Sequence, residues 1–94
     1  MEENKDNFIP PVPDFKFFAT TLTLQATIFL GQIPNPSTQK IEEDLPQAKF
    51  IIDTLGMLQE KTKNNLDKDE AQLLENLLYE LRSVYLSKSK GETK

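Results

Sequence analysis

The sequence predicts an all-α protein of three helices, at about residues 14–30, 45–63 and 68–86. Each segment carries apolar side chains at the spacing of a helix face, and an aspartate stands where its N-cap would be. The length of 94 residues is enough for one small domain. We therefore expect a single helical domain over 14–86, followed by a disordered polar tail at 87–94.

Residues 1–13 are predicted to form an extended, proline-rich arm in front of this domain. Three of its last four residues are proline, which fixes φ and removes the backbone donor that a helix needs. Pro10 and Pro13 also make a PxxP pattern, so a ligand for an SH3-type domain is the alternative to a stiff arm. Asp14 then suits the N-cap of the first helix, and Gly31 suits the left-handed residue that ends it.

The first helix carries two apolar stripes on opposite sides. One stripe consists of Phe15, Phe18, Ala19, Leu22, Ala26, Phe29 and Leu30. The second stripe, about 180° away, contains Phe17, Leu24 and Ile28. Because a surface helix of a monomeric bundle needs one apolar face, a helix that is apolar on two sides is expected to be covered on two sides.

The second helix repeats this pattern, since Phe50 and Met57 lie opposite its main apolar face. We therefore expect a homo-oligomer, with a two-fold dimer favoured and the first helix at the interface. In the alternative, the arm of the same chain folds back over the second stripe through Phe8, Ile9 and Val12.

A short joint is expected to fold the second and third helices into an antiparallel hairpin, on which the first helix packs. Asn64 suits a left-handed residue after the second helix. Asp67 and Glu70 have the spacing of a capping box at the start of the third.

Catalytic side chains are scarce in this chain. It has no histidine, cysteine or tryptophan, which excludes Ser–His and Cys–His dyads and zinc sites with imidazole or thiolate ligands. Gly31 is not followed by the second glycine and the Lys-Ser/Thr pair of a phosphate loop. A calcium loop starting at Asn65 fails, because Glu70 stands where glycine is needed and Asn76 where glutamate is needed. We expect no catalytic residue, no metal site and no cofactor, and the balance is against an enzyme.

The net charge of −4 argues against a nucleic-acid surface. All of the imbalance lies in residues 1–44, since 45–94 carry eight acids and eight bases. Nucleic-acid-binding surfaces show a one-sided basic excess, so weak association with nucleic acid is the last of the alternatives.

Hydropathy predicts a cytoplasmic protein with no membrane contact. The most apolar run, from Phe17 to Leu30, has 14 residues, whereas a spanning helix needs about 20. The start, MEENKDNF, is acidic and polar, unlike a signal peptide.

Two functions of different classes remain. The first is a structural or protein-interaction module that self-associates and could scaffold an unidentified protein partner. The second is a small-ligand-binding protein or enzyme that uses polar residues of the second and third helices. These residues are Asp53, Glu60, Thr62, Lys63, Tyr79 and Arg82.

Two side chains of the second helix carry local predictions. Asp53 is expected to contact Tyr79 or Arg82 across the hairpin, with an ion pair to Lys49 in its own helix as the alternative. Gly56, which costs about 1 kcal/mol against alanine in mid-helix, predicts a close approach of another backbone.

Several short motifs resemble one family. They are Asp14-Phe15, Leu30-Gly31-x-x-Pro34-x-Pro36, Ile52-Asp53-x-Leu55, Glu60-Lys61-Thr62-Lys63 and Leu77-Leu78-Tyr79-x-Leu81-Arg82. Over residues 9–86 the chain resembles the small bacterial helical family catalogued as domain of unknown function 1844. That family usually has glycine where this chain has Asn64, which agrees with a left-handed cap. The resemblance implies a helical, mostly stand-alone protein and supplies no mechanism.

Overall fold

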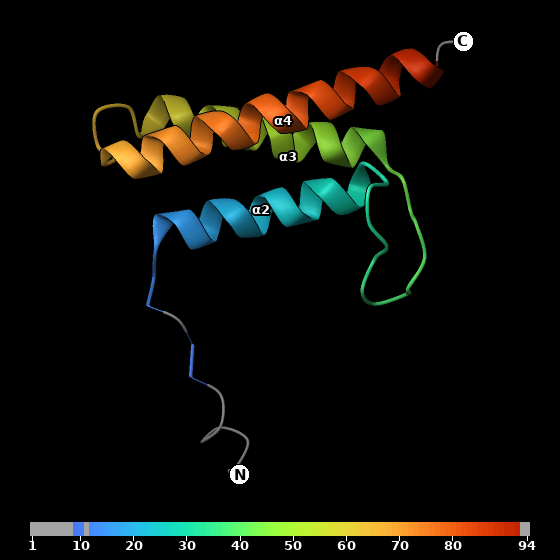
Figure 1. Ribbon diagram of the computed structural model, residues 1–94, viewed down its shortest axis with the longest axis horizontal. Helices are drawn as coiled ribbons and strands as arrows, with labels where there is room; N and C mark the ends of the chain where they lie inside the picture. The colour runs from blue at the N-terminus through green and yellow to red at the C-terminus, as the bar shows by residue number, and fades with distance from the viewer. Residues whose placement is uncertain (1–8, 11, 93–94) are drawn as a thin grey trace.

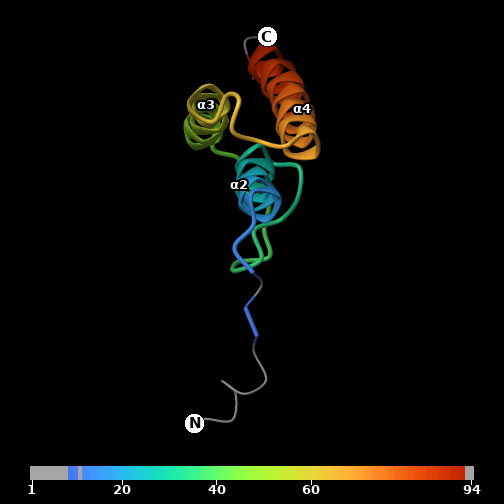
Figure 2. The ribbon, with the colours of Figure 1, turned by 90° about the vertical axis from the view of Figure 1, so that its left-hand side faces the viewer.

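The structure, a computed structural model, describes residues 9–10 and 12–92, which contain three α-helices and no strand. The helices are α2 (Phe15–Phe29), α3 (Leu45–Lys61) and α4 (Lys68–Glu92). The chain runs along α2, returns along α3 and runs back along α4, so α3 and α4 form an antiparallel hairpin on which α2 packs (Figure 1). Seen from the side, the three helices lie at the corners of a triangle (Figure 2). The predicted all-α fold is confirmed.

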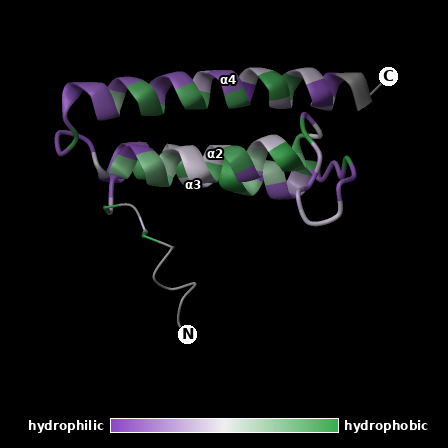
Figure 3. Cartoon of the chain, turned by 60° about the horizontal axis from the view of Figure 1, so that its bottom comes forward, coloured by the Kyte–Doolittle hydropathy of each residue, from purple (hydrophilic) through white to green (hydrophobic). Residues whose placement is uncertain are grey.

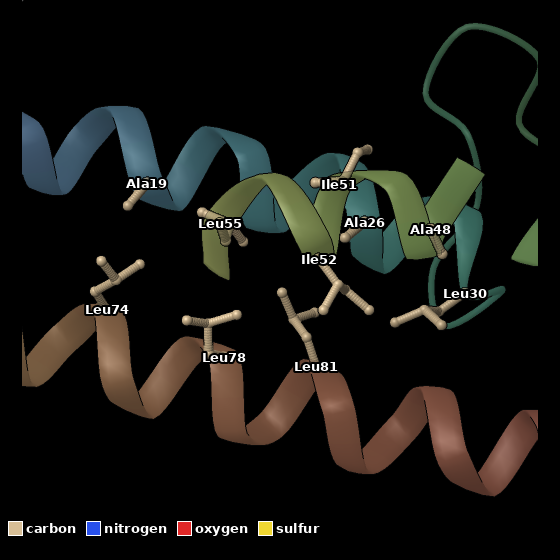
Figure 4. Close-up of a cluster of buried hydrophobic side chains, with 10 residues drawn as sticks. All are labelled: Ala19, Ala26, Leu30, Ala48, Ile51, Ile52, Leu55, Leu74, Leu78 and Leu81. Carbon is tan, nitrogen blue, oxygen red and sulfur yellow. The ribbon is translucent and has the colours of Figure 1, made fainter. Parts of the chain in front are cut away.

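The core lies at the centre of this triangle and takes side chains from all three helices. Its buried residues, drawn in Figure 4, are Ala19, Ala26, Leu30, Ala48, Ile51, Ile52, Leu55, Leu74, Leu78 and Leu81. Three of them are alanines with no exposed surface, and such small side chains let neighbouring helices approach closely. Burial of each leucine or isoleucine is worth about 1.5–3 kcal/mol, which helices of this length need because they are marginal alone.

The pairing of α2 with α3 has a defined register. At the loop end, the backbone N–H of Asp44 donates to the carbonyl of Phe29 at 2.7 Å. Further along, Ala26 lies between Ile51 and Ala48 (Figure 4). Both helices rise about 1.5 Å per residue and they run in opposite directions. A residue one position later in α2 therefore lies level with a residue one position earlier in α3.

Local sequence signals begin and end α2 and begin α3 as predicted. Asp14 Oδ2 accepts a hydrogen bond from the backbone N–H of Phe17 at 2.9 Å. Asp44 Oδ1 accepts one from the N–H of Gln47 at 3.2 Å. After α2, Gly31 has a φ of +77°, the left-handed conformation that closes a helix.

The joint between α3 and α4 also forms as predicted, although α3 ends at Lys61 rather than at residue 63. Asn64 has a φ of +71°. The backbone N–H of Glu70 donates to Asp67 Oδ1 at 2.8 Å, and the N–H of Asp67 donates to Glu70 Oε1 at 3.0 Å. This reciprocal pair is a capping box, so the stretch has a structural role in the turn.

The predicted end of α4 is wrong. Residues 87–92, expected to be a disordered tail, continue the helix to Glu92, while 93–94 lie outside the described residues. An ion pair of 3.0 Å joins Lys88 Nζ to Glu43 Oε2 in the loop that follows α2. This contact between distant parts of the sequence holds the extra turns against the bundle.

Phe18, predicted for the core, lies on the surface. It is 48% exposed, whereas Phe15 and Leu22 of the same stripe pack against the core. Phe18 stands about 100° around the helix from the buried Ala19, so it lies at the edge of the stripe. Its ring makes an edge-on contact with Phe15, with 6.5 Å between the ring centroids.

Candidate functional site

Large apolar side chains on the outer sides of α2 and α3 form the main candidate site, which we name the α2–α3 apolar surface. It consists of Phe17, Leu24, Ile28, Phe50 and Met57. Phe50 is 67% exposed, Phe17 57%, Leu24 50% and Met57 47%, while Ile28 is half-buried. Single exposed apolar residues are ordinary, but a group of this size is typical of a contact site.

The two helices carry these side chains at matching spacing. Phe17 and Leu24 are seven residues apart, and so are Phe50 and Met57, so each pair keeps to one line along its helix. In the antiparallel register of α2 and α3, Phe17 comes within about one helical turn of the level of Met57, and Leu24 of Phe50. The surface is therefore two rows on neighbouring helices.

Two threonine hydroxyl groups beside these rows are satisfied by the helices themselves. Thr21 Oγ1 donates to the carbonyl of Phe17 at 2.9 Å, and Thr54 Oγ1 donates to that of Phe50 at 2.8 Å. Such hydroxyl groups need no outside partner. Along α2 the one charged residue is Lys16, whereas Figure 3 shows α4 banded with hydrophilic residues along its length.

The described part of the arm does not cover this surface. Ile9 is 83% exposed and Val12 80% exposed, and both lie in backbone without regular secondary structure. Phe8, the third residue in the predicted fold-back, lies outside the described residues.

Asp53 is paired within its own helix. Its Oδ2 lies 2.8 Å from Lys49 Nζ, and the hydrogen bond with Asp53 raises the pKa of Lys49. Among the described residues, Asp53 makes no hydrogen bond or ion pair with Tyr79 or Arg82. The intrahelical alternative therefore takes the place of the predicted contact across the hairpin.

The other polar candidates are spread over separate hollows. Thr62 and Lys63 line a hollow of about 170 Å³ at the joint, and the Thr62 hydroxyl already donates to the carbonyl of Leu58 at 2.7 Å. Glu60 is exposed and lines none of the hollows described here. The structure therefore separates Glu60, Thr62 and Lys63 from Asp53, Tyr79 and Arg82, which line the groove described next.

A groove along the outer sides of α3 and α4 brings together three of the predicted polar residues, Asp53, Tyr79 and Arg82. It consists of two hollows, of about 390 and 230 Å³, with Arg82 and Leu86 on the walls of both. We name it the α3–α4 groove. Its other lining residues are Lys49, Ile52, Asp53, Gln59, Glu75, Leu78, Tyr79, Ser83 and Tyr85.

Gly56 lies under the guanidinium group of Arg82. A Cβ added at Gly56 would stand 2.9 Å from Arg82 Nη2. A close approach to Gly56 does occur, but the prediction of a neighbouring backbone is wrong. The group that approaches is the end of the Arg82 side chain. Only the three-dimensional structure could show this pair, which no spacing in the sequence marks.

Within the part of the chain that the structure describes, no group of three or more aspartate, glutamate, histidine or cysteine side chains is placed to bind a metal ion. None of the described helices combines the length and the apolar character needed to cross a membrane.

Comparison with known families decides where the chain belongs. The family described as Domain of unknown function (DUF1844) matches residues 12–87. The chain belongs to this family. No curated protein and no solved structure matches the chain. Membership in this family agrees with a small helical protein, and the family description gives no function.

Proposed function

We propose that this DUF1844 protein is a self-associating helical module, a two-fold dimer that buries the α2–α3 apolar surface of each copy against the other. The observation that carries the proposal is that α2 exposes Phe17 and Leu24 on its outer side, with Lys16 as its one charge. A helix that packs on its own chain through one side has no need of an apolar second side.

The expected gain from burial can be compared with the cost of association. These side chains are already about half covered, so further burial is worth about 0.7–1.5 kcal/mol each, half the value for a fully exposed side chain. Five of them in each copy give about 7–15 kcal/mol for a dimer. The entropic cost of association is about 4–15 kcal/mol, so the gain from burial is of the same size as this cost.

The shape of the surface favours a closed dimer. The two rows on α2 and α3 present the same patch on both copies, and a self-complementary patch closes about a two-fold axis. Thr21 and Thr54 bring no unsatisfied hydroxyl into the interface, because both donate to backbone carbonyls of their own helices. The proposal keeps the cytoplasmic location predicted from composition.

The experiment is to place charge in the interface. Leu24→Glu with Ile28→Glu adds two carboxylates to the outer side of α2, and we expect light scattering to show a monomer that keeps its helix content in circular dichroism. Gln72→Glu with Asn76→Glu is the matched control, because it adds the same charge at the same spacing to exposed positions of α4. We expect the control to remain a dimer.

Ile28 is half-buried, so its replacement could disturb the fold, and Phe50→Glu serves as a second variant at the most exposed position of the surface. It is also expected to give a folded monomer. Loss of the dimer in the control, or a dimer that survives both interface variants, contradicts this interface.

A further inference from the structure

The α3–α4 groove opens on a different side of the bundle from the α2–α3 apolar surface, and none of its lining residues belongs to α2. Its walls combine apolar side chains with Tyr79 and Tyr85. Grooves lined by aromatic side chains bind extended proline-rich segments, which lose little entropy because proline already fixes their conformation. Tyrosine and arginine are also the residues most enriched where binding energy concentrates.

Arg82 lies between the two hollows without a carboxylate partner. In the described part of the chain it makes no hydrogen bond or ion pair. Asp53, on the same groove wall, is already paired with Lys49 at 2.8 Å, and Glu75 forms no ion pair with Arg82. The guanidinium group is therefore available for a carboxylate brought by a ligand.

The proline-rich arm has the complementary features. Ile9 and Val12 are 83% and 80% exposed, and each precedes a proline, which favours extended backbone. In a polyproline II helix, these two residues lie on one side, one turn of about 9 Å apart. Tyr79 and Tyr85 line one hollow each, and six residues of α4 separate them by about 9 Å along the helix.

The sequence in front of the arm's apolar residues supplies the opposite charge to Arg82. It is net acidic, with Glu2, Glu3 and Asp6 against Lys5. The described arm residues lead away from the bundle on the side of α2, whereas the groove lies between α3 and α4 (Figures 1 and 2). A second copy is therefore better placed than the same chain to fill the groove.

We infer that the α3–α4 groove binds the proline-rich arm of a second copy of this chain in an extended conformation. Ile9 and Val12 pack on the apolar walls of the groove, and one of the preceding acids pairs with Arg82. The inference rests on the proposed self-association, which brings the second copy within reach. The arm would then link two copies of the chain, in addition to the contact through the α2–α3 apolar surface.

The absence of cysteine from the sequence allows a clean test by disulfide cross-linking. Full-length Val12→Cys is mixed with full-length Ser83→Cys, whose new thiol lies in the groove. The matched control is Asn76→Cys, at an exposed position of α4 outside the groove. We expect the mixed disulfide dimer to form several-fold faster with Ser83→Cys than with Asn76→Cys. A synthetic peptide of residues 1–14 is expected to slow the formation of the Ser83→Cys disulfide, because it competes for the groove.

Adding Arg82→Ala to the Ser83→Cys chain is expected to reduce the rate several-fold, and Arg82→Lys to restore part of it. Equal rates at positions 83 and 76, or a rate that Arg82→Ala leaves unchanged, overturn the inference. Light scattering separates this result from the proposed dimer. If the chain is a dimer but cross-linking is no faster at position 83 than at position 76, the groove site is contradicted and the dimer is not. If the chain is a monomer that binds fluorescent peptide 1–14 in an Arg82-dependent way, the dimer is contradicted and the groove site is supported.

Discussion

The helices α2 and α4 run in the same direction and both pack on α3, yet their outer sides differ. The outer side of α4 carries exposed polar residues such as Gln72 and Asn76, which hydrogen-bond to each other at 3.2 Å. The outer side of α2 carries Phe17 and Leu24, each at least half exposed. Although α4 also exposes Tyr79 and Leu86, it carries charged residues along its length, whereas α2 has Lys16 alone, so the outer side of α2 indicates a contact with something else.

The largest expected effect comes from the inner side, which both helices share. Leu78→Ala removes a side chain that is 1% exposed and leaves a cavity, so we expect it to lower the free energy of unfolding by about 2–5 kcal/mol. Leu86→Ala, at a position of α4 that is 58% exposed, is expected to cost less than about 1 kcal/mol. Urea denaturation followed by circular dichroism measures both, and equal costs would place the core elsewhere.

The next prediction concerns the outer side of α2. Because a dimer stabilises the folded state by mass action, the melting temperature of the native chain is expected to rise over an about hundredfold increase in concentration. Phe17→Ala is expected to weaken this rise, and Gln72→Ala on α4 to leave it unchanged. A melting temperature that does not depend on concentration would remove the proposed difference between the two helices.

The starts of the two helices give a smaller contrast. The cap of α2 is one hydrogen bond from Phe17 N–H to Asp14, whereas α4 has the reciprocal pair of Asp67 and Glu70. We expect Asp67→Ala to cost about 1 kcal/mol and Asp14→Ala somewhat less, because Asp67→Ala also leaves the Glu70 side chain without its positioned partner. Thermal unfolding of both variants at one protein concentration shows which substitution costs more stability. A larger loss of stability from Asp14→Ala than from Asp67→Ala would contradict the prediction.

The smallest effect is expected at Gly56 in α3. Gly56→Ala is expected to stabilise the fold by about 0.5–1 kcal/mol, because alanine favours the helix and the flexible end of Arg82 can swing away. The matched control is Gly31→Ala, which is expected to destabilise because φ is +77° there. A loss of stability in Gly56→Ala would show that the position of Arg82 over Gly56 contributes to the fold.

The features that could be predicted from the sequence are those fixed within a few residues. Asp14, Asp44 and Asp67 cap the predicted helices, and Gly31 and Asn64 adopt the expected left-handed conformation. Each depends on hydrogen bonds or φ values that neighbouring residues decide.

The features that could not be predicted depend on residues far apart in the sequence. The extra turns of α4 are held by the Lys88–Glu43 ion pair, and the place over Gly56 is filled by Arg82. Phe18 belongs to the correct stripe by periodicity, but its exposure depends on where the other two helices lie. The α3–α4 groove likewise exists only once the hairpin has closed.

The central claim is that the apolar outer side of α2 and α3 joins two copies of the chain. Multi-angle light scattering of the native chain at micromolar concentration tests it most directly. We expect twice the chain mass of 10.8 kDa for the native chain and a single chain mass for Leu24→Glu with Ile28→Glu. A native chain that elutes at 10.8 kDa across this concentration range would contradict the claim.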